Sequence, residues 1–202
     1  MLSEFNKNRL IQNFQLNQPV DYHHEALKRV SHLAKNDLRK ASVLIGFVER
    51  STGLNIIFTK RAHHLRHHPG QVSFPGGKFE SEDVSLSNTA LRETYEEIGI
   101  SREEISIFGQ MPELVTISKF SVTPFLAFIN EGYQTTIDKN EVDEVFEVPA
   151  SIVFDQSRLR SQQFQFSSHT HRVFGLSYKN HFIWGMTAQI IHAMQNHIMH
   201  QC

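Results

Sequence analysis

The segment GGKFESEDVSLSNTALRETYEEIGI, from Gly76 to Ile100, constrains the fold of this chain more than any other stretch. Its second half repeats apolar side chains at helical spacing, with serine and aspartate before it as candidate N-cap residues and Gly99 after it as a stop signal. The pattern predicts a helix from about residue 85 to residue 98. Because successive residues turn by about 100° around a helix, three glutamates fall together away from the apolar arc: Glu93, Glu96 and Glu97.

The acidic face of this predicted helix needs a physical reason. Glu93 precedes Glu96 and Glu97 by three and four residues, so these like charges repel one another by about 0.2–0.5 kcal/mol per pair. A bound divalent cation would offset the repulsion, because carboxylate oxygens are the ligands that Mg²⁺ and Mn²⁺ prefer. A solvated helix face with Arg92 paired to Glu96 explains the same letters. The residues around the helix therefore have to decide between these two interpretations.

Charge and composition exclude several classes of partner. The chain of 202 residues carries a formal net charge of -1, so it has no general basic field of the kind that attracts nucleic acid. No stretch approaches the roughly 18 apolar residues that a membrane-spanning helix requires. The single cysteine, Cys202, can form no intrachain disulfide, which favours a reducing compartment. We therefore expect a cytoplasmic protein without nucleic-acid or membrane partners, in which any phosphate is bound at a local site.

Runs rich in β-branched and aromatic residues flank the acidic segment. ASVLIGFVE and LNIIFTKR, joined by the polar turn RSTG, predict a β-hairpin. Further candidate strands are ISIFGQM, SVTPFLAFI, EVFEVP and HRVFGLSY, which Pro112 and Pro124 are expected to interrupt. The apolar spacing from Met186 to Met194 predicts a final helix, and the single Trp184 is expected in the core.

These elements together predict the fold class and the domain organisation. Strands mixed with a few helices indicate an α/β (α+β) fold, with a mixed β-sheet sandwiched between helices. The spaced apolar positions of residues 1–38 predict a short helical arm that packs on the domain, and residues 39–202 form the domain itself.

The acidic segment and its neighbours resemble the Nudix box, a loop-helix-loop motif of hydrolases that cleave a nucleoside diphosphate linked to another group. The resemblance rests on the glycine pair Gly76-Gly77, a loop, and then Arg-Glu-x-x-Glu-Glu-x-Gly from Arg92 to Gly99. The first glutamate of the general pattern falls on Asp83 when counted forward from Gly77, and on Val84 when counted back from Arg92. The resemblance implies a Nudix-type fold.

A narrower resemblance links the chain to the coenzyme A pyrophosphatases of that family. It is carried by IFTKRA at residues 57–62, then Arg66, Gly70, Gln71 and FPGG at residues 74–77. The box also has one residue more between its glycine and its arginine than the general pattern, as in that branch. The stretch IWGMTA at residues 183–188 is similar as well.

The resemblance assigns roles to the residues of the box. It implies that Glu93, Glu96 and Glu97 are metal ligands for Mg²⁺ or Mn²⁺, with Glu97 and Glu93 foremost in catalysis. Arg92 would orient these glutamates through charge-assisted hydrogen bonds. The turn at Gly76-Gly77 would let backbone approach the metal or the diphosphate, since only glycine permits so close a contact.

Residues outside the box complete the predicted site. One further carboxylate is expected to reach the metal or its water; Glu141 is preferred over Glu144, which could equally be a solvated strand residue. The local basic patch around HHLRHH, with Arg61 and Arg66, suits phosphate oxygens, including the 3′-phosphate of coenzyme A. A zinc site in these histidines is the weaker interpretation, because proline and glycine follow at once. Lys119 stands in a loop similar to a substrate-side loop of the same branch.

The predicted reaction is metal-dependent hydrolysis of the pyrophosphate of coenzyme A, or of acyl-CoA, to 3′,5′-ADP and 4′-phosphopantetheine or its acyl form. One alternative is a pyrophosphatase for another nucleoside diphosphate derivative, such as ADP-ribose or a dinucleoside polyphosphate. Another is a Nudix module that binds a nucleotide without cleaving it, because fold alone does not guarantee catalysis. The expected partner is a small-molecule substrate, and a homodimer that buries the N-terminal arm is compatible with the sequence.

Overall fold

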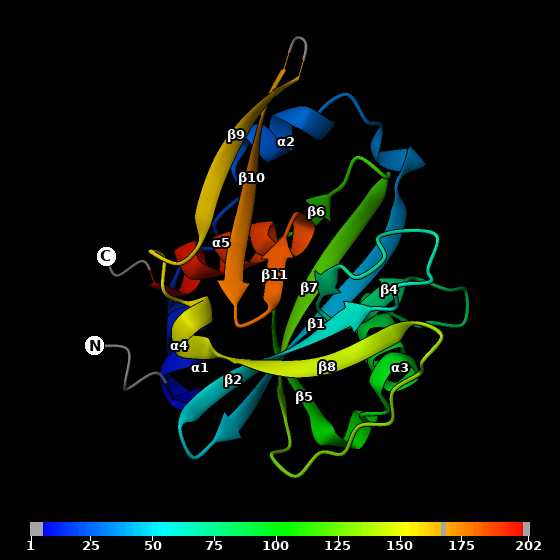
Figure 1. The fold of residues 1–202 in the computed structure, drawn as a ribbon, viewed down its shortest axis with the longest axis vertical. Coiled ribbons are helices and arrows are strands. Elements are labelled where there is room, and N and C mark those ends of the chain that lie inside the picture. Colours follow the sequence, from blue (N-terminus) through cyan, green and yellow to red (C-terminus); the bar gives the residue numbers. More distant parts are fainter. Residues whose placement is uncertain (1–5, 167–168, 200–202) are drawn as a thin grey trace.

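The computed structural model describes residues 6–166 and 169–199 and contains two β-sheets (Figure 1). The larger sheet has the order β3 (Val72–Ser73), β2 (Gly53–Arg61), β1 (Arg39–Arg50), β7 (Phe120–Ile129) and β5 (Ile105–Gln110); off this path, β4 (Gly76–Lys78) pairs with β1, β6 (Leu114–Val115) with β7, and β8 (Val142–Pro149) with β2. The smaller sheet has the order β11 (His181–Trp184), β10 (His169–Tyr178) and β9 (Arg160–Phe166). Cys202 lies outside the described residues.

Five α-helices and two 3₁₀ turns accompany these sheets in the described part of the chain. They are α1 (Lys7–Leu16), α2 (His24–Val30), α3 (Leu86–Ile98), α4 (Ala150–Val153) and α5 (Met186–Met199), with the turns Lys35–Asp37 and Arg102–Glu104. Both predicted long helices are confirmed. Residues 6–166 and 169–199 contain no helix with the length and apolar character to span a bilayer.

The first two strands form the predicted hairpin. β1 and β2 pair antiparallel, and Arg50 pairs with Gly53 at the turn. Gly53 has φ +113°, a conformation that glycine adopts without steric cost. β1 pairs on its other side with β7 in parallel, so the larger sheet is mixed, as expected.

The larger sheet is covered on both faces, which confirms the predicted sandwich (Figure 1). Alternate side chains of β1 point to opposite faces, as the period of a strand requires. Ile45 and Phe47 join one buried cluster with Ile190 and Met194 of α5. A second cluster on the other face contains Leu44 and Val48 of β1 together with Ala90, Leu91 and Ile98 of α3. The acidic helix and the C-terminal helix therefore lie on opposite sides of the sheet.

The N-terminal helices contact the C-terminal part of the chain. The Asn13 and Asn17 side-chain amides donate hydrogen bonds to the carbonyls of Ile198 and His197, at 3.1 and 2.9 Å. A His197 ring nitrogen lies 3.0 Å from the carbonyl oxygen of Phe14. The domain boundary at residue 38 and the burial of this arm against a second subunit stay predictions.

Two local expectations from the sequence are wrong. Pro124 does not interrupt its strand, because β7 continues through it and its carbonyl accepts a hydrogen bond from the Met111 N–H. Pairing with β5 ends at Phe125, so the missing proline N–H removes no bond from that side of the ladder. Trp184 is not in the core: its exposed fraction is 43%, because it lies on the outer face of the smaller sheet.

Candidate active site

The ends of α3 are fixed by the residues that the sequence indicates. The Ser85 hydroxyl caps the first turn by accepting a hydrogen bond from the Asn88 N–H. Gly99 ends the helix in the left-handed conformation, and its N–H donates to the Tyr95 carbonyl. A side chain at Gly99 would collide with Thr136. The loop of residues 136–142 therefore lies against this end of α3. The register of the acidic face is thereby set.

Glu97 is a buried carboxylate in the middle of the site. Only 3% of the residue is exposed, and the Gly76 N–H donates to its Oε2 at 3.4 Å. Burial and, next, the charge of Glu93 raise the pKa of Glu97 to about 8, while the Gly76 N–H and the positive charge of Arg61 oppose that rise. Such a group binds a proton or a cation in preference to remaining charged in a low-dielectric setting.

Glu93 lies directly over the second glycine of the turn. A Cβ atom on Gly77 would come closer than 3.0 Å to the Glu93 carboxylate, so a side chain at this position would force the carboxylate to move. Burial raises the pKa of Glu93, and the adjacent Arg92 guanidinium opposes this effect. Both glycines of β4 therefore lie beside a carboxylate. The Gly76 N–H donates to Glu97, and the Glu93 carboxylate lies where a side chain on Gly77 would be.

Arg92 connects the acidic face to the loop that precedes α3. Its Nε and Nη2 donate to the two oxygens of Asp83, each at 3.0 Å, and Nη2 also donates to the Lys78 carbonyl at 2.9 Å. Its Nη1 lies 2.7 Å from Glu96 Oε2 and 3.1 Å from Glu93 Oε1. The guanidinium is thus held by five acceptors and is engaged entirely within the protein.

Asp83 occupies the position that the sequence left open between two residues. It is 7% exposed and also accepts hydrogen bonds from the Thr89 hydroxyl at 2.8 Å and the Glu80 N–H at 3.0 Å. The hydrogen bonds from Arg92 hold its pKa down at about 2. Val84, the other candidate, is 89% exposed. Counting forward from Gly77 therefore locates the acidic partner of Arg92.

Glu96 differs from the other two glutamates of the helix. Its side chain is 55% exposed and turns to Arg92, four residues earlier, as in an ordinary helical ion pair. For this residue the solvated interpretation of the acidic face describes the geometry well. Its role as a metal ligand stays a prediction.

Glu141 is brought to the carboxylates by a loop that docks on α3. The Asp138 N–H donates to the Glu97 carbonyl at 3.0 Å, and the Ala62 N–H donates to the Glu141 carbonyl at 2.9 Å. The charge of Glu141 contributes to the raised pKa of both Glu93 and Glu97, so its carboxylate is near enough to act on theirs. Glu144 is directed elsewhere, because its Oε1 lies 3.4 Å from Nε2 of His181 in the smaller sheet.

Of the predicted substrate-binding residues Arg61, Arg66 and Lys119, all of which the structure describes, only Arg61 has an interaction with the carboxylates. Arg61 acts on Glu97 through its charge, and its backbone is tied to Gln71 and Gly70 by hydrogen bonds of 3.0 and 3.1 Å. Within residues 6–166 and 169–199, no hydrogen bond or ion pair joins Arg66 or Lys119 to the carboxylates. The substrate-binding roles of Arg66 and Lys119 therefore stay predictions.

The histidine-rich loop packs against the loop that carries Glu141. The His63 N–H donates to Asp143 Oδ2 at 3.1 Å, and a His64 ring nitrogen lies 3.1 Å from the Asn140 carbonyl oxygen. Among the described residues, these histidines do not belong to any close group of three metal-binding side chains. Their observed contacts position the neighbouring loop.

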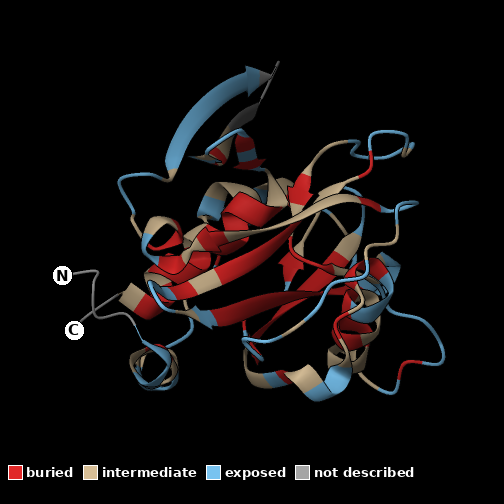
Figure 2. Ribbon diagram, turned by 60° about the horizontal axis from the view of Figure 1, so that its bottom comes forward, coloured by how far each residue is buried: buried red, intermediate tan, exposed pale blue. Residues whose placement is uncertain are grey.

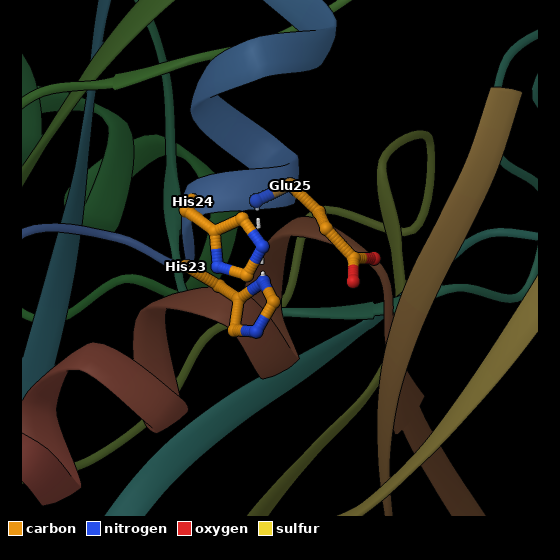
Figure 3. Close-up of side chains that lie close together, drawn as sticks. All are labelled: His23, His24 and Glu25. Carbon is orange, nitrogen blue, oxygen red and sulfur yellow. Dashed lines mark hydrogen bonds between the residues drawn. The ribbon is translucent and has the colours of Figure 1, made fainter.

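Another group of metal-binding residue types, which the sequence did not suggest, lies at the start of α2 (Figure 3). The ligand atoms of His23, His24 and Glu25 lie within 4.8 Å of one another, and no other three-residue group in the described ranges is so compact. Each end of the group already has a structural partner. His23 Nδ1 accepts from the Glu25 N–H at 3.3 Å, and the Glu25 carboxylate contacts Gln163 and Arg172. The box carboxylates are spread more widely, as uncompensated like charges would be.

The acidic helix, the glycine pair and the covered mixed sheet define a Nudix-type fold and site. A family model described as NUDIX domain matches residues 38–169, more than half of the sequence, and the chain belongs to this family. A protein from Enterobacter sp. (strain 638), named "Uncharacterized Nudix hydrolase NudL", is 42% identical over 76% of this chain and 79% of its own length. A relative of the same name from Yersinia pestis (strain Pestoides F) is 37% identical over 94% of this chain and 91% of its own length.

Solved structures of the same family are more distant in sequence. A MutT/nudix family protein from Enterococcus faecalis aligns with a TM-score of 0.49 at 14% identity, over 95% of this chain and 69% of the other. The M. smegmatis Nudix hydrolase RenU aligns with a TM-score of 0.49 at 20% identity, over 58% of this chain and 74% of the other. The names of these four proteins state no substrate.

Proposed function

We propose that this protein is a divalent-metal-dependent hydrolase that cleaves the diphosphate of coenzyme A, or of an acyl derivative, into 3′,5′-ADP and 4′-phosphopantetheine or its acyl form. The observation that supports the proposal is that Glu93 and Glu97 lie against the glycine pair of β4, while the charge of Glu141 is near enough to act on both. The three carboxylates come from two separate segments, and the charge of Arg61 acts on Glu97 while Arg92 contacts Glu93.

The residues at this place fit a hard divalent cation. Glu97 is almost fully buried and receives one long hydrogen bond, so its carboxylate lacks the partners that a buried charge normally has. Glu93, Glu97 and Glu141, with Glu96 at the solvent edge, would hold Mg²⁺ or Mn²⁺ through oxygen ligands. Such an ion lowers the pKa of water and neutralises negative charge on phosphoryl oxygens when it is bound.

The protein residues supply orientation and proton transfer. Arg92 holds Glu93 and Glu96 in place from the side of Asp83. Gly76 and Gly77 lack side chains where the backbone of Ser42 and the Glu93 carboxylate come close, and this lets the chain bring Glu93 and Glu97 beside the turn. Glu141 is an exposed carboxylate next to the buried ones and is suited to accept a proton from the attacking water. The water oxygen forms a bond to phosphorus, and the bridging P–O bond breaks.

The choice of coenzyme A rests on the resemblance of residues 57–77 to the signature of the coenzyme A pyrophosphatases. Arg61 adjoins the carboxylates, and Arg66 belongs to the following loop. Arginine forks suit the oxygens of phosphates, and coenzyme A carries a 3′-phosphate besides its diphosphate. ADP-ribose and dinucleoside polyphosphates lack that group and serve as comparison substrates.

The test is product analysis with purified protein. Coenzyme A, an acyl-CoA, 3′-dephospho-coenzyme A and ADP-ribose are each incubated with Mg²⁺ or Mn²⁺, and nucleotides are separated by chromatography. We expect 3′,5′-ADP from coenzyme A and a lower kcat/KM for the dephospho form. Equal or faster cleavage of ADP-ribose would show that the preferred substrate is another nucleoside diphosphate derivative. No cleavage of any of the four compounds would refute the proposed hydrolysis of these diphosphates.

A further inference from the structure

The smaller sheet has an outer face towards solvent, and β9 at its edge is coloured as exposed along residues 160–165 (Figure 2). Its inner face is closed, because Phe174, Leu176 and Ile183 are buried there. On the outer face, Phe164, Phe182 and Trp184 remain exposed by 40, 57 and 43%. Apolar rings gathered on a solvent-facing surface usually mark a binding site.

This face carries an open depression. A cavity of about 1170 Å³ opens over it, which we call the aromatic hollow. Its apolar lining includes Phe164, Val173, Gly175, Phe182 and Trp184, and its edge includes Arg158 and Arg160. The acidic helix α3 packs on a different sheet, so the hollow is separate from the carboxylate site.

The strand register puts a cation and an indole in one row across the hollow. Gly175 of β10 pairs with Arg160 of β9 on one side and with Trp184 of β11 on the other. Neighbouring strands lie about 4.8 Å apart, so the backbones of Arg160 and Trp184 are separated by about 10 Å. A Cβ atom on Gly175 would lie 2.6 Å from the tip of the Phe182 ring, so the ring leans over the glycine.

The two arginines at the edge differ in their partners. Arg158 is paired with Asp155 at 3.3 Å. Arg160 has no ion pair or side-chain hydrogen bond with any residue in the described ranges, and it is exposed. The hollow therefore combines ring faces with one guanidinium that is available to an anion.

We propose that the aromatic hollow binds a purine mononucleotide, with the base stacked on Trp184 and Phe182 and the phosphate on Arg160. Three of the exposed apolar walls are planar rings, which suits a planar base. A flexible hydrocarbon chain would stay largely uncovered in so open a site. Guanidinium and phosphate match in charge and geometry.

The protein carries its own reporter for this test, because Trp184 is its single tryptophan. The full chain is titrated with AMP and with adenosine in EDTA, and tryptophan fluorescence is followed. AMP contains no phosphoric anhydride, so it is not a substrate for the proposed hydrolysis. We expect saturable quenching by both compounds, with the tighter Kd for AMP. Arg160→Gln should raise the Kd for AMP about tenfold and leave that for adenosine unchanged, because only the charge-assisted phosphate contact is lost.

Three further arms test whether the quenching arises from binding in the aromatic hollow. Phe182→Ser should raise the Kd for AMP and for adenosine alike, since it removes a stacking surface. Glu97→Gln should leave both Kd values unchanged, because it alters only the carboxylate site. Octanoate represents an aliphatic anion and should not saturate the fluorescence change. Absence of quenching by AMP, an AMP Kd that Arg160→Gln does not alter, an AMP Kd that Glu97→Gln alters, or saturation by octanoate alone would each overturn the proposal.

Discussion

Asp83 and Arg92 form a two-point pair in which each carboxylate oxygen accepts one guanidinium hydrogen bond at 3.0 Å. The pair joins the loop before the acidic helix to the middle of that helix. The same guanidinium also contacts Glu93 and Glu96. Asp83 thereby determines where Arg92 can point, and Arg92 determines where two glutamates can point. Positioning of this kind fixes a site whose charged members would otherwise repel one another.

Replacing Asp83 with alanine should disturb both stability and turnover. The Arg92 guanidinium would lose its two-point partner, so we expect the free energy of unfolding to fall by about 1–3 kcal/mol. The glutamates would lose their support, and kcat should fall about 10- to 100-fold. Urea denaturation and the coenzyme A assay measure these effects. Val84→Ala is the control, because Val84 is 89% exposed and the change should leave both quantities nearly unaltered; equal effects of the two substitutions would contradict the role of Asp83.

The acidic helix shows which features of the site can be predicted from the sequence. Its period, its serine cap and its final glycine predict the element to within about one residue, because these signals act within a few positions of the chain. The approach of Glu141 to Glu97 depends instead on a loop that is held to the helix by the Asp138 N–H and to the end of β2 by the Ala62 N–H. No local pattern encodes such a contact. The preference for Glu141 over Glu144 follows from the apolar pattern of the next strand, and its catalytic meaning stays a prediction.

Gly77→Ala should separate activity from stability. The new Cβ atom would come closer than 3.0 Å to the Glu93 carboxylate, which is the movable end of a side chain and can turn away. We therefore expect the melting temperature to change little, whereas kcat should fall about 100-fold because a ligand group is displaced by about 1 Å. Gly132→Ala is the matched control, since its added Cβ would meet nothing closer than 3.6 Å. Unchanged turnover in Gly77→Ala would show that the position of Glu93 does not limit the reaction.

The pair Glu141→Gln and Glu144→Gln compares two carboxylates that lie three residues apart. Glu141 acts on Glu93 and Glu97, while Glu144 lies 3.4 Å from His181. If Glu141 accepts the proton of the attacking water, its substitution should lower kcat by about 10²- to 10⁴-fold. Glu144→Gln should retain most of the activity. Steady-state kinetics at saturating substrate distinguish the two, and the reverse order would assign the base to Glu144.

The smaller sheet marks the limit of prediction from the sequence. β9 has the sequence RSQQFQF, in which polar residues dominate and no buried face is visible, so its strand character comes from pairing with β10. Trp184 looks like a core residue by composition, because large aromatic side chains are usually buried. Its exposure follows from alternation in β11, where the buried His181 and Ile183 take the inner positions and leave Trp184 outside. Tertiary pairing decides both features.

The raised pKa of Glu97 predicts that the free energy of unfolding depends on pH, and that Glu97→Gln reduces this dependence. The pKa of Glu97 is about 8 in the folded, metal-free protein, against an ordinary value of 4.5. Between these two pH values the folded state holds a proton that the unfolded state has released. The free energy of unfolding in EDTA should therefore fall as pH rises from 5 to 8. Glu97→Gln removes this titration, so its stability should fall less over the same range, as urea denaturation at each pH would show.

The same group should couple cation binding to proton release. At pH 7 the metal-free Glu97 is largely protonated, and a divalent ion can bind only after the proton leaves. The affinity for Mn²⁺ should therefore increase as pH rises from 6 to 8, and titration calorimetry in buffers of different ionisation enthalpy should detect a released proton. Glu97→Gln should bind the ion more weakly and release less of a proton. Wild-type binding that is independent of pH across this range, with no proton released, would place the cation away from Glu97.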